Sequence, residues 1–510
     1  MDADGQDAGS LRQGPRRALD GYGRAVASVA VTYVPENTEE VTDLLERANA
    51  EGLSVTIRGA GRSYGDAAIN EGGVVLDLRK LNRVLSWDPT SGIIEVEPGA
   101  TIEDLWRTGL PDGWWPTVVP GTMFPTIGGC VAMNIHGKNH FRVGGFGDQV
   151  LDMDILCPTG QRIRCSRDER PDIFGAVVGG LGVLGITTRV RLQMKRVHSG
   201  HLQVEALSVP DLNGLFDQFE SRLPNSDYLV GWLDCFPGGN ALGRGVIHAA
   251  HYAPVDKAPG GERSLSLDAQ SLPDRFFGVI PRRLMWRLLH PWVNNFGMRL
   301  VNLAKYWTAR MMNKPGKTFL QSHVAFAFLL DYVPRWRDAY GKGGFIQVQP
   351  FVPADRAREA FRKILETCQA HGIIPYLGVF KRHRPDEFLL SHALDGYSLA
   401  LDIRVTEANR ERVWSLGQAI GDIVVEAGGR FYFAKDAVAR SDQVAGAFGS
   451  EAIERFTALK RELDPRGLLS SQLSRRILPA LSDPRQQTPE DAPDAPPAPP
   501  APDGTDGPGE

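Results

Sequence analysis

The chain has 510 residues and a formal net charge of -4, with 42% of the residues hydrophobic and 23% charged. This composition is typical of a soluble globular protein, and the length predicts two or three domains. The slightly acidic balance argues against a nucleic-acid partner held by overall charge.

Both ends of the chain have compositions that cannot bury a core. Residues 1–18 are polar, and residues 483–510 are rich in Pro, Ala, Asp and Gly, so we predict disorder in both. The N-terminus has no apolar run typical of a signal peptide, and no apolar stretch reaches the roughly 18 residues of a spanning helix. We therefore expect a cytoplasmic protein, with the option of peripheral attachment to the inner face of the membrane.

The five cysteines are scattered and form no CxxC pair. A zinc site or a disulfide framework is therefore not expected, and we predict no metal. Cys157 and Cys165 could be bridged if they lie on paired strands, but free buried thiols are the favoured interpretation.

From residue 29 the pattern alternates between strands and helices. Asn37 caps a helix, with Glu40 completing a capping box, and Gly52 ends it. Thr101 caps a second helix. This order predicts a mixed sheet with helices in a domain that spans 19–197. Its strands are expected at 29–33, 54–58, 74–77 and 93–96.

The middle of the chain, 198–429, alternates strand-like runs with helical patterns and predicts an antiparallel sheet backed by helices. The last part, 430–478, contains one strand and several helices. The fold class is therefore α+β with two domains, the second built on an antiparallel sheet. In the middle region strands are expected at 228–232, 345–351, 376–380 and 398–405, and helices at 354–371 and 407–427.

Two glycine-rich segments lie in the N-terminal half, at 58–66 and at 120–140. Glycine lets backbone N–H groups approach a phosphate and adopts positive φ without strain. Taken alone, the first segment fits a simple turn equally well. The second adds Gly121, the pair Gly128 and Gly129, and small hydroxyl side chains, so the two could clamp a dinucleotide together. The arrangement is not a Rossmann GxGxxG fingerprint.

A third glycine-rich run, 178–186, lies within an apolar stretch. It fits either close packing of a sheet on a helix or a backbone that lies along a flat ring system. His136 and His140, taken alone, are more typical of structural histidines held by hydrogen bonds than of catalysts.

These segments together resemble the FAD domain of the vanillyl-alcohol-oxidase superfamily, which has the PCMH-type FAD-binding fold. Within it, the sequence is most similar to the decaprenylphosphoryl-β-D-ribose 2'-oxidase family, over roughly residues 21–478 and most weakly between about 200 and 317. The resemblance implies an FAD-binding domain at 19–197, a substrate domain at 198–429 and a C-terminal part, 430–478, that completes the FAD site.

By this resemblance, FAD contacts are expected at Ile57, Arg58, Gly59, Ala60, Gly61, Arg62, Ser63, Tyr64, Gly65, Asp66, Ala67, Gly121, Thr126, Ile127, Gly128, Gly129, Met133, Asn134, Ile135, His136, Ile186 and Tyr432. Many superfamily members carry a histidine, covalently linked to the flavin, where this chain has Arg62 followed by Ser63. We therefore predict non-covalent FAD.

The family's catalytic lysine matches Lys435. Taken alone, this residue would more often be a surface lysine in a salt bridge. A cation beside the flavin or the substrate oxygen would stabilise the negative charge that develops in alcohol oxidation. The resemblance also places Tyr64 and His136 at the border of the reactive pocket, as further catalytic candidates.

Substrate contacts are implied at Tyr340, Gln347, Gln349, Lys381, Ser398 and Lys435. Gln347 and Gln349 share a strand face because side chains alternate with a period of two, and Lys381 could meet a phosphate. Each could also be a solvated polar residue. The chain departs from the family at two positions, with Ser398 in place of an asparagine and Ala400 in place of a cysteine. The first change bears on the identity of the sugar, and inhibitors that trap the cysteine are expected to fail here.

Residues 280–317 form a basic segment that contains no Asp or Glu. On a helix, one face would carry Leu300, Leu303, Trp307 and Met311, and the opposite face Asn302 and Lys305. This composition fits the plane of an anionic membrane surface. The alternative is a helix whose apolar face packs on the domain and whose basic face is solvated.

The resemblance implies an FAD-dependent oxidase of a sugar hydroxyl, specifically the 2'-OH of a polyprenyl-phosphate-linked ribose. The resulting keto-sugar would pass to an NAD(P)H-dependent short-chain reductase, giving net epimerisation in the synthesis of a cell-wall arabinan precursor. The alternatives are an FAD-dependent oxidase of another sugar or alditol, a sterol-type reductase on the same fold, and a non-enzymatic membrane-docking scaffold.

Overall fold

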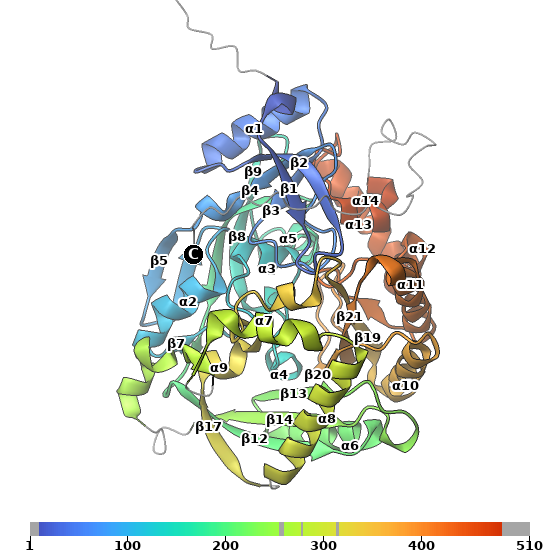
Figure 1. Ribbon diagram of the computed structural model, residues 1–510. Helices are drawn as coiled ribbons and strands as arrows, with labels where there is room; N and C mark the ends of the chain where they lie inside the picture. The colour runs from blue at the N-terminus through green and yellow to red at the C-terminus, as the bar shows by residue number, and fades with distance from the viewer. Residues whose placement is uncertain (1–9, 254–259, 277–278, 313–315, 482–510) are drawn as a thin grey trace, which may run out of the picture.

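The computed structural model describes residues 10–253, 260–276, 279–312 and 316–481, and its α+β architecture confirms the predicted fold class (Figure 1). Two small sheets and their helices form the N-terminal domain. One large antiparallel sheet forms the second domain, and the C-terminal helices return to the first. The predicted disorder at 1–9 and 483–510 lies outside the described residues.

The first sheet has the order β1-β2-β4-β3, in which β1 and β2 are antiparallel and the other pairs are parallel. Its strands are β1 (Arg16–Asp20), β2 (Ala27–Tyr33), β3 (Val55–Arg58) and β4 (Val74–Asp77). Helix α1 (Thr38–Ala50) connects β2 to β3. The predicted cap is confirmed, because Asn37 Oδ1 accepts a hydrogen bond from the Glu40 N–H at 2.9 Å.

The prediction of disorder is wrong for residues 10–18. Strand β1 begins at Arg16 and pairs along its whole length with β2, and Leu11 is fully buried. The segment is polar because β1 is an exposed edge strand, and its order comes from the backbone hydrogen bonds of β1 and from the burial of Leu11.

The second sheet is antiparallel, with the order β5-β6-β10-β8-β9. Its strands are β5 (Val84–Asp88), β6 (Ile93–Val96), β8 (Val150–Leu156), β9 (Arg162–Ser166) and β10 (Ile186–Gln193). The mixed sheet expected from the sequence is thus the first sheet, but the strand expected at 93–96 does not belong to it. Residues 93–96 form β6, which pairs with its neighbour β5 and with β10. The second of these is a distant partner that local alternation of apolar residues cannot reveal.

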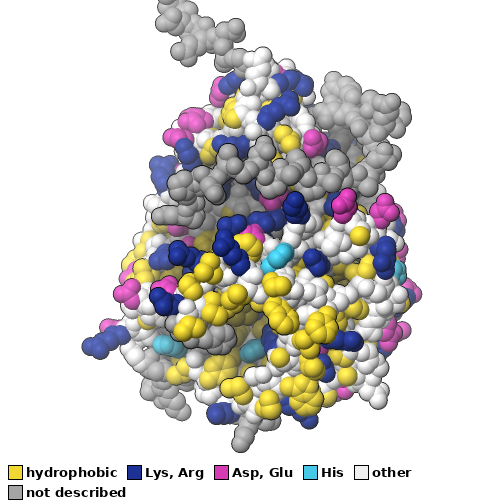
Figure 2. Space-filling model, viewed as in Figure 1, with side chains coloured by type: hydrophobic (Ala, Val, Ile, Leu, Met, Phe, Trp, Pro, Cys, Tyr) yellow, Lys and Arg dark blue, Asp and Glu magenta, His cyan; other side chains and the backbone are white. Residues whose placement is uncertain are grey.

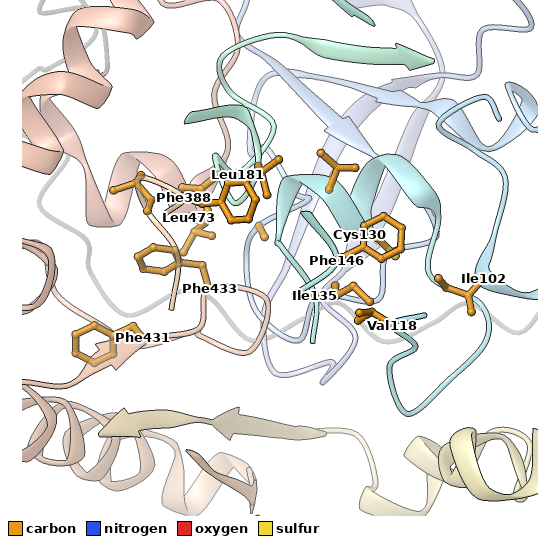
Figure 3. Close-up of a cluster of buried hydrophobic side chains, with 14 of the residues drawn as sticks. Ile102, Val118, Cys130, Ile135, Phe146, Leu181, Phe388, Phe431, Phe433 and Leu473 are labelled. Atoms are coloured by element: carbon orange, nitrogen blue, oxygen red, sulfur yellow. The ribbon is translucent and has the colours of Figure 1, made fainter. Parts of the chain in front are cut away.

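Short helices of the N-terminal domain pack against its strands, α2 against β5, α3 against β10 and α5 against β9. They are α2 (Ile102–Gly109), α3 (Ile127–Ala132), α4 (His140–Val143) and α5 (Pro171–Val177). Thr101 and Asp104 form a capping box at α2, as expected for Thr101. Figure 3 shows Cys130 of α3 beside Phe146 and Ile135, while Phe388, Leu181 and Leu473 gather around Phe433 from the C-terminal part.

The second domain is built on a nine-stranded antiparallel sheet with the order β17-β12-β14-β13-β20-β21-β19-β22, in which β18 also pairs with β21. Its strands are β12 (His201–Val209), β13 (Tyr228–Leu233), β14 (Gly245–Tyr252), β17 (Thr318–Ser322), β18 (Phe345–Val348), β19 (Pro350–Pro353), β20 (Leu377–His383), β21 (Gly396–Arg404) and β22 (Arg430–Phe431). The strand expected at 345–351 is thus divided at Gln349. Helices α6 (Leu212–Arg222), α10 (Ala354–Ala370) and α11 (Arg410–Glu426) pack against the sheet (Figure 1).

The C-terminal part leaves the large sheet at β22 and packs on the N-terminal domain through α12 (Ser441–Phe448), α13 (Ser450–Leu463) and α14 (Gln472–Ile477). Val55 of β3 donates to the Leu468 carbonyl at 2.8 Å and accepts from the Ser470 N–H at 2.9 Å. The last helices are thereby tied to the strand that leads into the first glycine-rich segment.

The basic segment forms α7 (Met285–Leu289) and α8 (Asn295–Met312) on the outside of the molecule (Figure 1). Two short strands, β15 (Arg275–Phe276) and β16 (Ile280–Pro281), precede them, and β7 (Trp114–Trp115) pairs with β11 (Lys195–Arg196) elsewhere. None of the described helices combines the length and the apolar composition needed to cross a bilayer. All five cysteines are free and buried.

Candidate functional site

One cavity lies where the glycine-rich segments of the N-terminal domain meet the C-terminal part. Among the predicted residues, its lining includes Ile57, Arg58, Gly59, Ala60, Gly61, Arg62, Ser63, Tyr64, Ala67, Gly121, Thr126, Gly128, Gly129, Met133, Ile135, Ile186, Tyr432 and Lys435. The structure therefore brings all three glycine-rich segments and the lysine segment to one space, although they are far apart in the sequence.

The first two segments touch because glycine leaves room for the contact. A Cβ atom at Gly59 would stand 2.0 Å from Thr126 Oγ1, and Gly61 has a φ of +60°. The first segment also contacts the C-terminal part, since the Tyr64 N–H donates to the Ala434 carbonyl at 2.8 Å. A side chain at Gly59 would therefore separate the first two glycine-rich segments, and one at Gly61 would strain the backbone.

The chemistry of the lining fits a flavin nucleotide. Bare backbone at the glycines offers N–H groups to a diphosphate, and Arg62 Nε is buried with no hydrogen-bond partner in the described chain. An unpartnered guanidinium nitrogen inside a cavity is suited to an anionic group. The described lining contains no His or Cys side chain. That the cofactor is non-covalent stays a prediction.

Five of the predicted FAD residues do not line the cavity, namely Gly65, Asp66, Ile127, Asn134 and His136. Asp66 instead binds the Arg476 guanidinium with two bonds of 2.8 and 2.9 Å. Asn134 donates to Asp386 at 2.9 Å and to Ser391 at 3.1 Å. The motif spacing does not separate residues that face the cavity from residues that hold the loop in place.

Lys435 lies in the cavity wall with its Nζ 3.5 Å from the centre of the Tyr64 ring. Its ammonium group donates no hydrogen bond within the described chain, so it is available to a ligand. Burial lowers the pKa of Lys435, and the charge of Asp402 partly opposes this. Burial raises the pKa of Asp402, and Gln347 and Lys435 partly oppose that change. The protonation of Lys435, which faces the cavity, thus depends on its burial and on the charge of Asp402.

Tyr64 is buried between the cavity and the aromatic side chains of the second domain. Its ring lies 5.2 Å from the Tyr22 ring and 5.5 Å from the Phe345 ring, and Tyr340 packs on Phe345 at 4.5 Å. Burial, followed by the Asp402 charge, raises the pKa of the Tyr64 phenol well above its ordinary value. The phenol is therefore protonated and can donate a hydrogen bond.

The other predicted substrate residues form a buried hydrogen-bond chain. Gln347 donates to Asp402, and Gln349 donates to Ser398 Oγ at 3.0 Å and lies 3.1 Å from His136 Nε2. Lys381 Nζ lies 3.5 Å from His136 Nδ1. The structure thus joins Gln349, Ser398, Lys381 and His136 in one network, which His383 extends through a 2.7 Å contact with Ser398.

Four buried histidines meet beside this network: His136, His140, His383 and His392. The His140 and His383 ring centres are 4.6 Å apart, and those of His136 and His383 are 5.0 Å apart. Within the described residues the cluster does not have the arrangement needed to hold a metal ion. Burial lowers the pKa of all four histidines, so they stay neutral.

We expect the apoprotein to lose stability as the pH falls below about 6.5. Buried histidines with a lowered pKa bind protons only when the chain unfolds. Each one therefore lowers the free energy of unfolding by about 1.4 kcal/mol per pH unit in this range. His248 and His323, with pKa values lowered to about 4, add to the four. Asp331 and Asp386, with pKa values raised to about 6, and Asp402 act in the opposite direction but are fewer. Urea unfolding between pH 7 and 4.5 measures the slope, and a flat profile would contradict this assignment.

The cavity is also lined by residues that were not among the predicted FAD contacts. They are Tyr22, Ala68, Leu78, Pro98, Pro120, Thr122, Pro125, Ala132, Leu181, Gly182, Gly185, Thr187, Leu330 and Ala434. Leu181, Gly182 and Gly185 belong to the third glycine-rich run, whose apolar glycines were the available signal. Tyr22 and Leu330 come from segments without a motif, and only the fold brings them here.

Comparison with known proteins agrees with this geometry. Residues 29–166 match the FAD binding domain family. A decaprenylphosphoryl-β-D-ribose oxidase of Mycolicibacterium smegmatis is 31% identical over 475 residues, which cover 90% of this chain and 97% of that protein. An uncharacterized FAD-linked oxidoreductase of Mycobacterium tuberculosis is 31% identical over 166 residues (31% of this chain, 36% of the relative). A D-lactate dehydrogenase of Anaerostipes hadrus is 28% identical over 179 residues (34% and 37%).

The shorter matches are limited to about a third of each chain, whereas the mycolicibacterial protein is matched along nearly its whole length. The matched domain is an FAD binding domain, and one relative is named an FAD-linked oxidoreductase, which confirms the predicted cofactor and the class of enzyme. The chain is therefore an FAD-dependent oxidoreductase that belongs to the decaprenylphosphoryl-β-D-ribose oxidase family.

Proposed function

We propose that the protein oxidises a hydroxyl group of a lipid-phosphate-linked sugar, specifically the 2'-OH of a polyprenyl-phosphate-linked ribose, to a ketone. The observation that carries this proposal is the buried ammonium group of Lys435, which lies over the Tyr64 ring in the wall of the FAD cavity and donates no hydrogen bond within the described residues. The full-length similarity to an oxidase named for such a sugar supports it. An NAD(P)H-dependent short-chain reductase would then reduce the ketone from the other face, which gives net epimerisation.

Each site residue has a chemical task in this proposal. When bound, FAD supplies the two-electron acceptor for the hydride of the substrate C–H bond. Lys435 stabilises the negative charge that develops on the substrate oxygen, and the protonated Tyr64 beside it donates a hydrogen bond. Gln349, Ser398, His136 and Lys381 are joined to one another by close polar contacts. In this proposal the first three would bind the sugar hydroxyls, and Lys381 would meet the phosphate. The family's asparagine is Ser398 here, a shorter side chain that reshapes the sugar site.

Anaerobic flavin reduction tests the substrate. The holoenzyme is mixed with a short-chain prenyl-phosphoribose, with the arabinose epimer and with free alditols, and flavin bleaching is followed. Fast bleaching by the phosphoribose alone supports the proposal. Bleaching by alditols with no response to the phosphoribose would assign the chain to another sugar or alditol.

A membrane-bound substrate requires an enzyme that reaches the bilayer, and we propose that α8 provides the docking surface for an anionic membrane. In this helix a polar side chain is buried and a row of apolar side chains is exposed, which is the reverse of a typical surface helix. Asn302 is only 2% exposed and donates to the Tyr376 carbonyl at 3.3 Å, whereas Leu300, Leu303, Trp307 and Met311 face outward. Figure 2 shows hydrophobic side chains gathered over α7 and α8 with Lys and Arg among them. An exposed apolar face of this kind is rare on a soluble protein unless it binds an apolar partner.

We expect the double variant Leu303→Glu/Trp307→Glu to bind vesicles of phosphatidylcholine and phosphatidylglycerol about 10- to 100-fold more weakly than the parent protein. Leu303 is 36% and Trp307 47% exposed, so the surface that they can bury in the membrane amounts together to that of about one side chain, which contributes roughly 1.5–3 kcal/mol. Sedimentation with vesicles measures the affinity. Leu85→Glu is the matched control, because Leu85 is an exposed leucine on β5. Equal binding by the two variants would remove α8 from the docking surface.

A further inference from the structure

A second cleft, of about 440 Å³, opens at the N-terminal end of α8, between this helix and the start of α11. Its lining residues are Asn294, Asn295, Phe296, Gly372, Ile373, Ile374, Tyr376, Arg404, Thr406, Asn409 and Arg412. None of them belongs to the FAD cavity or to the network around His136. The cleft is therefore separate from the proposed catalytic site.

The cleft carries an excess of positive charge. Arg404 and Arg412 line it, and its described lining includes no Asp or Glu. Within the described residues neither arginine forms an ion pair. Arg404 donates from Nε to the Tyr340 carbonyl at 3.3 Å, and Arg412 donates to the His371 carbonyl at 2.5 Å. Each keeps further guanidinium N–H groups, and this fork geometry matches the oxygens of a phosphate.

The first turn of α8 adds backbone donors on the same side. Asn294 Oδ1 accepts from the Gly297 N–H at 3.0 Å, but the N–H groups of Asn295 and Phe296 have no acceptor in the part of the chain that the structure describes. Tyr376 donates to Asn295 Oδ1 at 3.0 Å, which directs the Asn295 amide N–H₂ group away from that bond. The N-terminus of this 18-residue helix thus reinforces the arginines in favouring an anion.

The apolar stripe of α8 begins at the rim of this cleft. Phe296 lines the cleft and is 72% exposed, and Leu300, Leu303, Trp307 and Met311 continue the stripe along the helix. A ligand with its phosphate between the arginines would therefore find a path for apolar chains beside it. This combination distinguishes a lipid from a free phosphate.

We propose that this cleft binds the phosphate group of an anionic membrane lipid whose acyl chains lie along the exposed stripe of α8. The proposal rests on the membrane docking proposed above and gives it a specific headgroup site. The phosphate of the sugar substrate belongs elsewhere, because in a phosphoribose it is bound to the carbon next to the reacting one. The rings of Tyr64, Phe345, Tyr340 and Tyr376 form a continuous aromatic layer between Lys435 and the cleft.

Monomeric dihexanoylphosphatidylglycerol, below its micelle concentration, tests the site on the holoenzyme by isothermal titration calorimetry. We expect saturable binding, weakened about 10- to 100-fold by Arg412→Gln, because the variant loses a charge-assisted hydrogen bond to the phosphate. Asn295→Asp, which places a carboxylate in the cleft, should weaken it at least as much. Arg356→Gln is the control, because Arg356 is an exposed arginine on α10. Inorganic phosphate should compete only weakly.

Binding that is unchanged in Arg412→Gln and Asn295→Asp would overturn the proposal, as would inorganic phosphate that competes as well as the lipid. The outcome is separate from that of the proposed function. Flavin reduction by a short-chain phosphoribose should be the same in Arg412→Gln and the parent protein. Vesicle binding by the Leu303→Glu/Trp307→Glu variant reports on the stripe alone.

Discussion

Replacing Lys435 by alanine is expected to leave FAD bound and to slow anaerobic flavin reduction by about 100- to 1000-fold. The ammonium group faces the cavity without a hydrogen bond in the described chain, and in the proposed mechanism its charge stabilises the substrate oxygen as the proton leaves. Most of the lining that would hold the nucleotide does not involve this residue. Stopped-flow absorbance measures the reduction rate, and the visible spectrum of the purified protein measures FAD content.

Two further variants separate charge from packing. Lys435→Met keeps an apolar stem over the Tyr64 ring but removes the charge, so it should lose as much rate as alanine. Lys363→Ala removes an exposed lysine paired with Glu426 and should change nothing. A reduction rate that survives in both Lys435 variants would remove this lysine from its proposed role.

Replacing Arg476 by methionine is expected to cost about 3 kcal/mol or more of unfolding free energy and to weaken FAD binding. Arg476 binds Asp66 in the first glycine-rich segment and Asp436, next to Lys435, at 2.8 Å each. Its removal leaves two largely buried carboxylates without their cation. Because Asp66 ends the first glycine-rich segment and Asp436 follows Lys435, we expect FAD affinity and the free energy of unfolding to fall together.

Urea unfolding of the apoprotein and titration with FAD measure the two effects of Arg476→Met. The control is Arg440→Met in the same part of the chain, where the arginine pairs with exposed Asp422 and Asp442. Exposed pairs contribute about 1 kcal/mol or less, so this variant should resemble the parent protein. If the two variants lost equal stability, the bridge between the segments would not be the cause.

The features that the sequence predicted correctly depend on neighbouring residues. The caps at Asn37 and Thr101 need only a side-chain oxygen and a backbone N–H three residues away. The glycine-rich segments could be recognised because glycine is the residue that permits the approach of Gly59 to Thr126. The family resemblance rests on these same segments, and it is confirmed along 90% of the chain.

The features that were missed depend on distant partners. Strand β6 pairs with β10, and Asp66 pairs with Arg476, so neither role is visible near the residue itself. The outward face of α8 could be assigned only once Asn302 was seen to donate to Tyr376 inside the fold, because an amphipathic pattern does not tell which face is buried. The roles of Tyr340, Gln347 and the other substrate residues remain predictions.

The return of the C-terminal part to β3 sets an order for folding on the ribosome. Thr56 donates to the Ser470 carbonyl across 414 positions, and Tyr432, Ala434 and Lys435 close one wall of the cavity. The cavity cannot be complete until nearly the whole chain has been synthesised. Until then, the glycine-rich loops of a nascent N-terminal domain lack their contacts with the C-terminal part. Closing the cavity is a non-local step and therefore slow, and FAD that binds only the closed cavity stabilises the finished protein.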